Sequence, residues 1–490
     1  MDIQLYWSNF GSSTNFTDTA IIFTVLFVSA TAWLLYDIYR NFQELCRFPS
    51  KIGFAAVGLV YLISYLNTFP GYFAFSECFT MNYCLTGAAH EWKGAFDSLF
   101  VAAGLLLFRG PGFVPLVNSI MMVWLAAQSF ILLEKYCKYR FGALLVVLLF
   151  CNPIALGFAV MHFRDVTFSL LLTMISVLFV NQPTRRNLIG GLTVAAALLR
   201  PDGKILLLLV PAVLFFIYEL TLKRALLLSA VLFFISISLE TSYNSLFKTD
   251  FYRNDYVAMT FAGPVSNIVK ARGLDSLSPE EQTSYGKFIN EENIKSSFNP
   301  LQKDLTDSNS LNLKTISDSW PEFRNLSLKL IVLNLPEFIF DRLRYIGYHF
   351  FLMDEVLTLQ DSYMFRTPPH PLCDRSFGAI NGFDSQRQVR DGAAWQFEAL
   401  QSYFKSDSSI LRLMRSYLVP FAFVLLCLLL FRKSRTLAGS ALVPLSKFFV
   451  VLLIAPSGNY HYLLPVLFYF TVLFPAVFLL IPRPDAPNKV

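Results

Sequence analysis

A histidine, an arginine and an aspartate lie close together where one apolar segment ends and the next begins. The stretch 161–165 reads Met-His-Phe-Arg-Asp and is followed by the apolar run 166–180. Charged groups beside a membrane segment are costly unless they face water, a partner or a substrate. A carboxylate in the first turn of a helix is also favoured by the helix dipole. His162, Arg164 and Asp165 therefore indicate either an interfacial anchor or a functional site.

Carboxylates and aromatic side chains also gather in the loop 69–112. Glu77 follows Ser76 in an aromatic setting, and Glu91 and Asp97 lie further along the same loop. A positioned carboxylate is a common general base. Aromatic residues at such a place are equally typical of a belt at the membrane surface. We take Glu77 as the candidate base, with Glu91 and Asp97 in reserve.

An Arg-Pro-Asp-Gly turn at 200–203 separates two short apolar segments. Interrupted hydrophobic pieces are a usual means by which a membrane protein brings backbone and charge to a site. Arg200 suits a phosphate or pyrophosphate because its planar guanidinium can pair with two oxygens. The alternative is an ordinary turn held by an ion pair between Arg200 and Asp202.

A polar and aromatic stretch opens the last apolar segment. It includes Tyr460, His461 and Tyr462. His461 could bind phosphate or a sugar hydroxyl, and Tyr460 would support it. The alternative is a belt of tyrosines at the membrane surface.

The composition is that of an all-α polytopic membrane protein. The chain has 490 residues, of which 55% are hydrophobic and 15% charged, and its mean hydropathy is +0.50. We expect about eleven transmembrane helices, although several apolar runs are shorter than the ~20 residues that cross a bilayer comfortably. The runs are 19–36, 53–68, 113–133, 141–160, 166–180, 187–200, 204–219, 225–240, 413–431, 437–455 and 461–482.

The lysines and arginines of the short loops predict the orientation of the chain. Cytoplasmic loops carry an excess of these residues. An N-terminus outside and a C-terminus in the cytoplasm place all the short basic loops on one side, with segment 97–108 in the outer interface or re-entering the membrane. The basic residues are Arg40, Arg47, Lys51, Lys135, Lys138, Arg140, Arg185, Arg186, Lys223, Arg224, Arg432, Lys433, Arg435, Arg483 and Lys489.

This orientation puts the candidate site residues on the outer side and divides the chain into parts. Residues 1–240 form an N-terminal transmembrane module with the outer loop 69–112. The polar region 241–412 is expected to be a small α-rich extracytoplasmic domain, and 413–490 holds the C-terminal transmembrane helices.

Several function classes have no support in the sequence. It contains no Walker loop, dinucleotide-binding glycine pattern, His-Glu-x-x-His motif or nucleophile elbow. The net charge of +6 is modest and comes from short basic loops, which indicates membrane orientation and not nucleic-acid binding.

The order of these pieces resembles the GT-C superfamily of polytopic glycosyltransferases that depend on lipid-phosphate sugars. The Phe-Pro-Gly loop at 69–71, the later Trp92 and the pair Arg164-Asp165 are most similar to bacterial members. In those proteins a Tyr-Pro-Gly loop carries an Asp-Ser pair, a Trp-His-Pro element follows, and Lys-Asp opens a later span. This chain departs from the pattern with Ser76-Glu77 and with Trp92-Lys93-Gly94.

The resemblance implies an inverting transfer of a sugar from a polyprenyl-phosphate donor to a glycan, lipid or protein acceptor. Glu77 would be the base, and Asp165 a second acid that orients the acceptor or a metal. Arg164, Arg200 and His461 would hold the donor phosphate, with His162 beside them. Some superfamily members need Mg²⁺ or Mn²⁺ and others do not. The expected location is a bacterial inner membrane, with the site facing the periplasm or the cell exterior.

Two other functions remain open. A polysaccharide polymerase or ligase that joins lipid-linked oligosaccharides would depend on arginines and a histidine instead of Glu77. A non-enzymatic lipid or ion transporter would use the pairs Arg164–Asp165 and Arg200–Asp202 as a gated pathway. Lys447, inside an apolar run, is the main charge away from the segment ends. The donor sugar, the acceptor and the oligomeric state cannot be inferred from the sequence.

Overall fold

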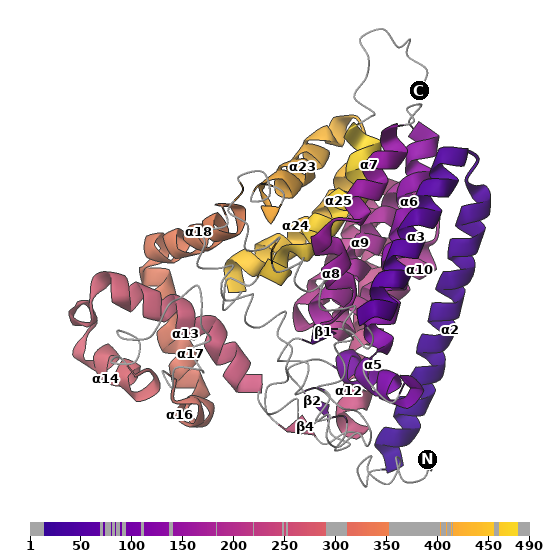
Figure 1. Cartoon of the computed structure of the whole chain (residues 1–490). Helices are drawn as coiled ribbons and strands as arrows, with labels where there is room; N and C mark the ends of the chain where they lie inside the picture. Colours follow the sequence, from indigo (N-terminus) through magenta and orange to yellow (C-terminus); the bar gives the residue numbers. More distant parts are fainter. Residues whose placement is uncertain are drawn as a thin grey trace.

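The computed structural model is a bundle of α-helices with a smaller helical group beside it (Figure 1). It describes residues 14–68, 72–73, 80, 84, 89–90, 95–108, 112–136, 141–182, 184–218, 220–246, 249–250, 253–290, 311–351, 402, 408, 413, 415–454 and 460–478. The bundle helices are α2 (Thr14–Glu44), α3 (Phe48–Thr68), α5 (Ala95–Phe108), α6 (Phe113–Tyr136), α7 (Phe141–Phe150), α8 (Pro153–Ala159), α9 (Arg164–Asn181), α10 (Arg186–Leu199), α11 (Leu206–Tyr218), α12 (Leu222–Leu246), α23 (Leu418–Leu429), α24 (Arg435–Ile454) and α25 (Leu464–Phe478). The 3₁₀ turns η2 (Pro201–Ile205), η5 (Leu430–Arg432) and η6 (Tyr460–Leu463) join some of them.

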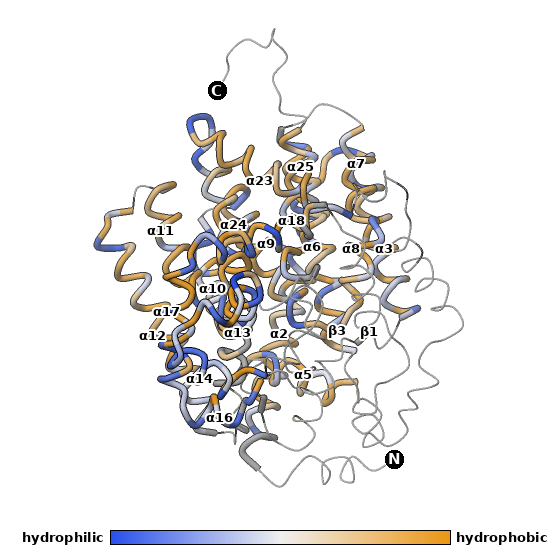
Figure 2. Tube along the Cα trace, turned by 90° about the vertical axis from the view of Figure 1, so that its left-hand side faces the viewer, coloured by the Kyte–Doolittle hydropathy of each residue, from blue (hydrophilic) through white to orange (hydrophobic). Residues whose placement is uncertain are grey.

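The apolar helices are those of a membrane-embedded, multi-pass protein. Within the described residues, 6 helices are long and apolar enough to cross a bilayer, or up to 7 if a bent pair counts as one span. The expectation of about eleven crossings also counted apolar runs that form shorter helices, such as α10 with 14 residues and α23 with 12. Such lengths fall below the ~17–25 residues that span a hydrocarbon core. Figure 2 shows hydrophobic residues along the whole bundle.

The expected single run 141–160 is broken in the middle. Helices α7 and α8 meet at an angle of 51°. Pro153 at the start of α8 has no backbone N–H, so α7 cannot continue through it without losing a hydrogen bond. The Asn152 side chain caps the new helix by accepting a hydrogen bond from Ile154 N at 2.8 Å. Tyr61 of α3 donates to the Phe150 carbonyl at 2.9 Å, so this end of α7 stays satisfied. A hydropathy pattern registers only the apolar run and not this break.

Helix α9 is the centre of the bundle. In its apolar window 83% of the residues are buried within the protein, against 17% in α2. It packs against α6, α10, α24 and α25. Helix α2 therefore lies at the edge, where most of its apolar face is exposed, and Figure 1 shows it along one side of the bundle.

Two short parallel strand pairs join loops that are far apart in the sequence. Strand β1 (Tyr72–Phe73) pairs with β3 (Met161–His162), so that Phe73 is opposite His162. Strand β2 (Ala89–His90) pairs with β4 (Thr249–Asp250). The start and the middle of the loop 69–112 are thereby held close to other segments of the chain, and β1 adjoins the segment that leads into α9.

Different segments of the chain lie at the two ends of the bundle. At one end, Arg47 N donates to Glu134 of α6 at 2.9 Å, and Arg185 forms an ion pair with Asp37 of α2 at 3.2 Å. We call this the basic-loop end. At the opposite end of α6, Asn118 donates to the Met161 carbonyl of β3 at 3.4 Å. We call that the β3 end. Three of the expected basic loops, near residues 40–51, 135–136 and 185–186, thus lie together at the basic-loop end and not at the β3 end.

Helix α5 occupies the segment expected in the outer interface or as a re-entrant piece. It packs against α2, α6 and α10, and its middle residues are buried. Its 14 residues are apolar throughout except for Asp97 and Ser98 in the first turn. The described part of loop 69–112 is thus largely a helix inside the bundle.

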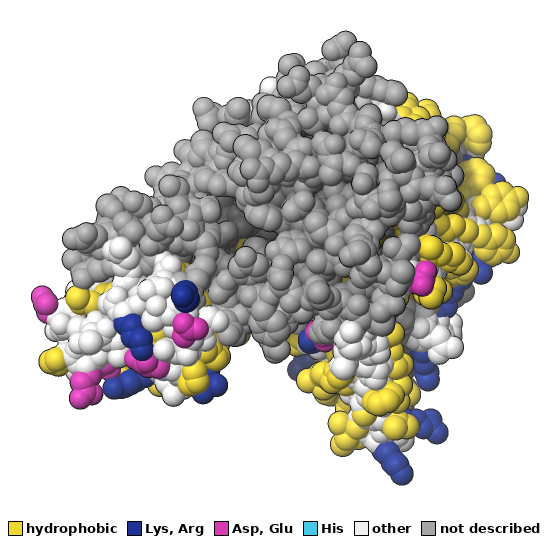
Figure 3. All heavy atoms as spheres, turned by 90° about the horizontal axis from the view of Figure 1, so that it is seen from below, with side chains coloured by type: hydrophobic (Ala, Val, Ile, Leu, Met, Phe, Trp, Pro, Cys, Tyr) yellow, Lys and Arg dark blue, Asp and Glu magenta, His cyan; other side chains and the backbone are white. Residues whose placement is uncertain are grey.

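A separate helical group follows α12, which itself extends past the expected boundary at 240 to Leu246. It comprises α13 (Arg253–Arg272), η3 (Leu274–Ser276), α14 (Pro279–Phe288), α16 (Leu313–Asp318), α17 (Trp320–Leu333) and α18 (Leu335–Phe351). These helices share a small core of their own, which includes Tyr285, Phe288 and Phe323. Figure 3 shows side chains of both charges on this group. It fits the α-rich part expected within 241–412; its side of the membrane stays a prediction.

Candidate functional site

Four charged side chains from three segments form a continuous chain of ion pairs at the β3 end. Asp165, in the first turn of α9, pairs with Arg200, which lies between α10 and η2. Arg200 Nε in turn pairs with Asp202 Oδ1 at 2.7 Å, and the other oxygen of Asp202 pairs with Lys447 of α24. We call Asp165, Arg200, Asp202 and Lys447 the charged chain.

The charged chain is buried. Asp165, Arg200 and Lys447 are exposed by only 4%, 5% and 5%, respectively. Buried charges are tolerated when they are paired and hydrogen-bonded, and breaking such a pair by removing one partner is strongly destabilising. Asp165 also sits where the dipole of α9 favours a negative charge. Each of the four charges therefore depends on an oppositely charged neighbour, and these ion pairs fix the positions of all four side chains.

Two aromatic rings flank the cations of this chain. The Arg200 guanidinium lies 5.6 Å from the Phe168 ring and 5.8 Å from the Tyr462 ring. Lys447 Nζ lies 5.3 Å and 5.6 Å from the same two rings. A cation within about 6 Å of a ring centroid is attracted to it. Phe168 of α9 and Tyr462 of η6 thus hold two cations at one place.

The turn 200–203 depends on a glycine. A Cβ at Gly203 would lie 2.4 Å from the Ala196 carbonyl oxygen and 2.9 Å from the Phe168 ring. Gly203 N donates to Arg200 O at 2.9 Å, which tightens the turn. Only a residue without a side chain lets η2 approach α10 and α9 this closely. The Arg200–Asp202 ion pair expected for an ordinary turn is present. In addition, Arg200 pairs with Asp165 and Asp202 pairs with Lys447, so the turn is connected to two other helices.

His162 and Arg164 are buried beside the charged chain, on the segment that leads into α9. His162 stands in β3 opposite Phe73 of β1. Thr167 donates to Asn118 at 2.8 Å, and this fixes the start of α9 to α6. Arg164 is close enough to Lys447 for an electrostatic interaction. Arg164 is therefore near the charged chain, and His162 lies on the same segment, three positions before Asp165.

Cations outnumber carboxylates among these residues. Arg164, Arg200 and Lys447 carry three positive charges, and Asp165 and Asp202 carry two negative ones. Like charges brought together in a buried place repel one another, so an anion placed against them would be stabilised. The N–H groups of the first turn of α9 add to this preference.

Lys447 is the member of the chain that the sequence did not assign to a site. It lies inside the apolar run 437–455, where the hydropathy pattern registers it only as an isolated charge. An ionisable residue inside a membrane segment is by itself a signal for a functional partner. The sequence shows that Lys447 needs a partner, but it does not show that the partner is Asp202, because 245 positions separate the two residues.

The other expected site residues are not all gathered here. Glu77 and Glu91 lie outside the described residues, and of Tyr460 and His461 only the backbone, in η6, is described. Asp97 is buried in the first turn of α5 and accepts a hydrogen bond from Thr80 at 3.4 Å. It is not a member of the charged chain. Of the candidate residues, Asp165, Arg200 and Asp202 are in direct contact.

The charged chain does not have the character of a divalent-metal site. No group of three or more histidine, cysteine, aspartate or glutamate side chains that could hold a metal occurs in the part of the chain that the structure describes. Mg²⁺ and Mn²⁺ prefer carboxylate, carbonyl and water oxygens. Here each carboxylate is engaged by arginine or lysine, and these residues fit an anion better than a metal cation.

Comparisons with known proteins found no relative. No family model matches the chain, and no curated protein and no solved structure is similar to it.

Proposed function

We propose that this protein is a membrane glycosyltransferase that moves a sugar from a polyprenyl-phosphate donor to an acceptor at the β3 end of the bundle. The observation that supports this most is the convergence of two cations, Arg200 and Lys447, on one buried place between two aromatic rings. A phosphate needs such fixed positive charge, and its polyprenyl chain needs the surrounding bilayer.

In this proposal the charged chain holds the donor phosphate. Arg200 has one terminal nitrogen paired with Asp165 and its Nε paired with Asp202, so it contributes its positive charge and its remaining N–H groups, and Lys447 adds a compact charge. Asp202 positions both cations, since it is paired with each of them. Arg164 at the start of α9 and His461 in η6 would complete the phosphate contacts. Tyr460 is a supporting residue.

The proposed chemistry is a single inverting displacement. Glu77 takes the proton of the acceptor hydroxyl, and that oxygen attacks the anomeric carbon. The bond between this carbon and the phosphate oxygen breaks, and polyprenyl phosphate leaves with its negative charge stabilised by the cations. The β1–β3 pairing supports a role for the loop that carries Glu77, since β1 joins that loop to His162.

Asp165 acts in this proposal mainly through Arg200. Its carboxylate is paired with that guanidinium, so it orients the phosphate-binding group and is one step removed from the acceptor. His162 lies beside it, and Glu91 and Asp97 remain reserve carboxylates. The protein would reside in a bacterial inner membrane with the site facing the periplasm.

One observation favours transport as a second candidate function. Lys447 lies within a membrane helix and pairs with Asp202 of another segment. Buried ion pairs of this kind can open and close along an ion or lipid pathway. The polymerase or ligase that uses lipid-linked oligosaccharides would share the phosphate site but not the requirement for Glu77.

An activity assay separates these functions. The purified full-length protein would be given labelled lipid-phosphate sugars and membrane acceptors, and release of polyprenyl phosphate would be measured. We expect Glu77→Gln and Asp165→Asn to lose at least about 100-fold in rate. Glu240→Gln, which changes a partly buried carboxylate that is paired with Lys204 and lies outside the charged chain, is the control and should keep its activity. Full activity of Glu77→Gln would favour the polymerase, and ion or lipid flux without release would favour transport.

A further inference from the structure

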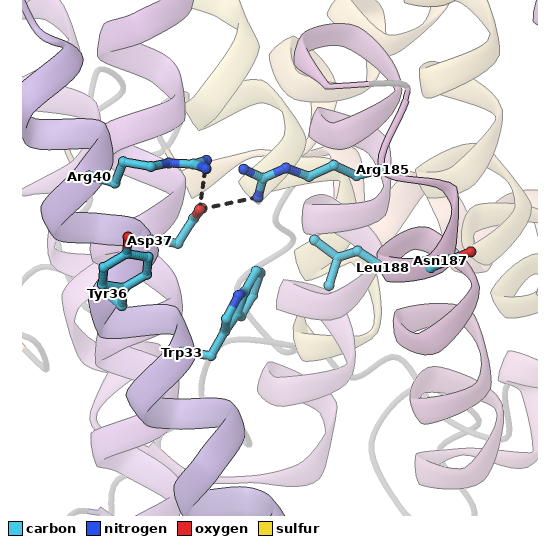
Figure 4. Close-up of a pocket in the computed structure, with 7 residues that line it drawn as sticks. All are labelled: Trp33, Tyr36, Asp37, Arg40, Arg185, Asn187 and Leu188. Carbon is cyan, nitrogen blue, oxygen red and sulfur yellow. Dashed lines mark hydrogen bonds and ion pairs between the residues drawn. The ribbon is translucent and has the colours of Figure 1, made fainter.

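A second charged site lies at the basic-loop end, away from the charged chain. It is a cavity of about 330 Å³ between α2 and the start of α10. Figure 4 shows Arg40 of α2 and Arg185 of the turn before α10 extending toward each other, with Asp37 between them. Their ion pairs measure 2.8 Å for Arg40–Asp37 and 3.2 Å for Arg185–Asp37. The glycosyl transfer proposed above makes no use of this place.

The side chains that line the cavity carry a net positive charge, although Arg40 also pairs at 3.6 Å with Glu44, which is not among the lining residues. Among its lining residues, two arginines face one aspartate, and that aspartate is buried. Asp37 is also bound by Trp124 of α6, whose Nε1 donates to it at 2.9 Å. Both oxygens of the Asp37 carboxylate therefore already have partners within the protein. Both arginine side chains line the cavity, where an anion would be attracted.

The start of α10 adds a second source of positive potential. Asn187 and Leu188, in the first turn of this 14-residue helix, line the cavity. The capping residue Arg185 makes no side-chain hydrogen bond to the helix N–H groups. The first N–H groups of a helix have no partner within it, and they favour negatively charged ligands. Two arginines and a helix start thus meet at one cavity.

The surroundings of the cavity are those of a lipid and not of a soluble anion. Trp33 and Tyr36 line it from α2 and are exposed by 41% and 64%. Exposed tryptophan and tyrosine are typical of the boundary between headgroups and hydrocarbon. Below them α2 exposes apolar side chains such as Leu26 and Val25, which would lie against acyl chains. Basic pockets between membrane helices suit anionic headgroups.

We propose that the cavity between α2 and α10 binds the phosphate headgroup of an anionic phospholipid. The phosphate contacts Arg40 and Arg185 and faces the N–H groups that open α10. Trp33 and Tyr36 surround the glycerol region, and the acyl chains follow the apolar face of α2. The bound lipid joins α2, which is the least buried helix of those that could span the membrane, to the central bundle.

Titration of the full-length protein in a neutral detergent tests this proposal. Native mass spectrometry would compare dioctanoyl phosphatidylglycerol, dioctanoyl phosphatidylcholine and inorganic phosphate. We expect the anionic lipid to bind at least about tenfold more tightly than the zwitterionic lipid, and Arg185→Gln to weaken that binding by about tenfold or more. Arg186→Gln removes the same charge one position away, outside the cavity, and should stay within about twofold of wild type.

A second variant keeps the test decisive if Arg185→Gln does not fold. Leu188→Trp fills the cavity without changing its charge, and it should also weaken binding of the anionic lipid. Equal losses in Arg185→Gln and Arg186→Gln would overturn the proposal, since they indicate diffuse surface charge. Equal binding of both lipids would overturn it too. Binding of inorganic phosphate as tight as that of the lipid would show a simple anion site instead.

Discussion

Lys447 of α24 forms an ion pair with Asp202 of η2, although 245 positions separate them in the chain. This contact ties the turn after α10 to a helix near the C-terminus. Because Asp202 also pairs with Arg200, and Arg200 with Asp165, three segments of the bundle share one set of charges. A change at any of the four residues should therefore affect the others.

Replacement of Lys447 by glutamine should remove both a phosphate contact and a structural link. We expect the transfer rate to fall by about 100-fold or more, since one buried donor to a developing charge has effects of that size. The free energy of unfolding should fall by about 3 kcal/mol, because Asp202 loses one of its two partners. Both can be measured on the purified protein, by the release assay and by denaturant titration.

Lys204→Gln is the matched control for that variant. Lys204 belongs to the same turn, but its pair with Glu240 is only partly buried, with 41% and 36% of the side chains accessible. An exposed pair contributes under about 1 kcal/mol, and Lys204 is not part of the charged chain. A loss of activity in Lys204→Gln equal to that in Lys447→Gln would contradict a specific role for Lys447.

A double-mutant cycle should show that Asp202 and Lys447 are coupled. We expect Asp202→Asn and Lys447→Gln together to cost less than the sum of the single changes, by about 1–3 kcal/mol of unfolding free energy. The reason is that the second change removes a charge that the first had left unpaired. Additive effects, within about 0.5 kcal/mol, would mean that the ion pair does not form in the membrane.

The sequence predicted part of this site. Asp165, Arg200 and Asp202 could be picked out because charges at the ends of apolar runs are costly and need a reason. The pair Arg200–Asp202 was one of the two interpretations of the turn, whereas the contact of Asp165 with Arg200 was not predicted and depends on the packing of α10 against α9. Lys447 and Phe168 could not be assigned, because each lies within an apolar run and its partners are remote in sequence. Glu77 lies outside the described part of the chain, so its role stays a prediction.

Gly203→Ala tests whether the tight turn is needed. The added methyl group would meet the Ala196 carbonyl oxygen at 2.4 Å, so backbone must shift. We expect a loss of about 1–3 kcal/mol in unfolding free energy and a loss of transfer activity, because Arg200 and Asp202 move with the turn. Thermal denaturation and the release assay would measure the two effects.

Gly191→Ala in α10 is the control for the glycine variant. A Cβ at Gly191 meets nothing within 4 Å, and alanine is a better helix former than glycine by about 1 kcal/mol. Its stability should be unchanged or slightly higher. Equal behaviour of the two alanine variants would show that the approach of η2 to α10 is not a constraint.

The stability of the helical group α13–α18 should fall at acid pH. Hydrogen bonds from the Lys329 side chain and from Ser278 hold the pKa of Glu281 below its usual value. The folded state therefore binds this proton less well than the unfolded state does. The stabilisation is present above the unfolded pKa of about 4.3 and is lost as the pH falls below it, toward the folded pKa. Hydrogen-exchange protection of α14 and α17 in the full-length protein would measure it.

Lys329→Gln should reduce this pH dependence. We expect the protection of α14 at about pH 6 to fall by about twofold to tenfold, as for an exposed ion pair, and to change less on acidification than in the wild type. Lys314→Gln changes another exposed lysine of the group and should leave the wild-type pH response. A wild-type response in Lys329→Gln would assign the pH dependence to other carboxyl groups.

The general architecture was easier to predict than its details. The energy of moving apolar side chains into a bilayer makes runs such as 166–180 visible in one sequence, and α9 occupies that run. The break between α7 and α8 was missed because Asn152 and Pro153 interrupt the run without making it polar. The pairing of β1 with β3 joins two loops that no local pattern links. How many of the shorter helices cross the bilayer depends on packing that hydropathy does not describe.

An equilibrium binding measurement tests most directly whether Arg200 and its partners bind a lipid-linked phosphate. The affinities of polyprenyl phosphate and of the uncharged polyprenol would be compared for wild type, Arg200→Gln and the control Lys204→Gln. We predict that wild type and the control bind the phosphate form at least about 100-fold more tightly, and that Arg200→Gln loses most of this preference. Equal affinity of wild type for the two lipids, or an unchanged preference in Arg200→Gln, would contradict the account.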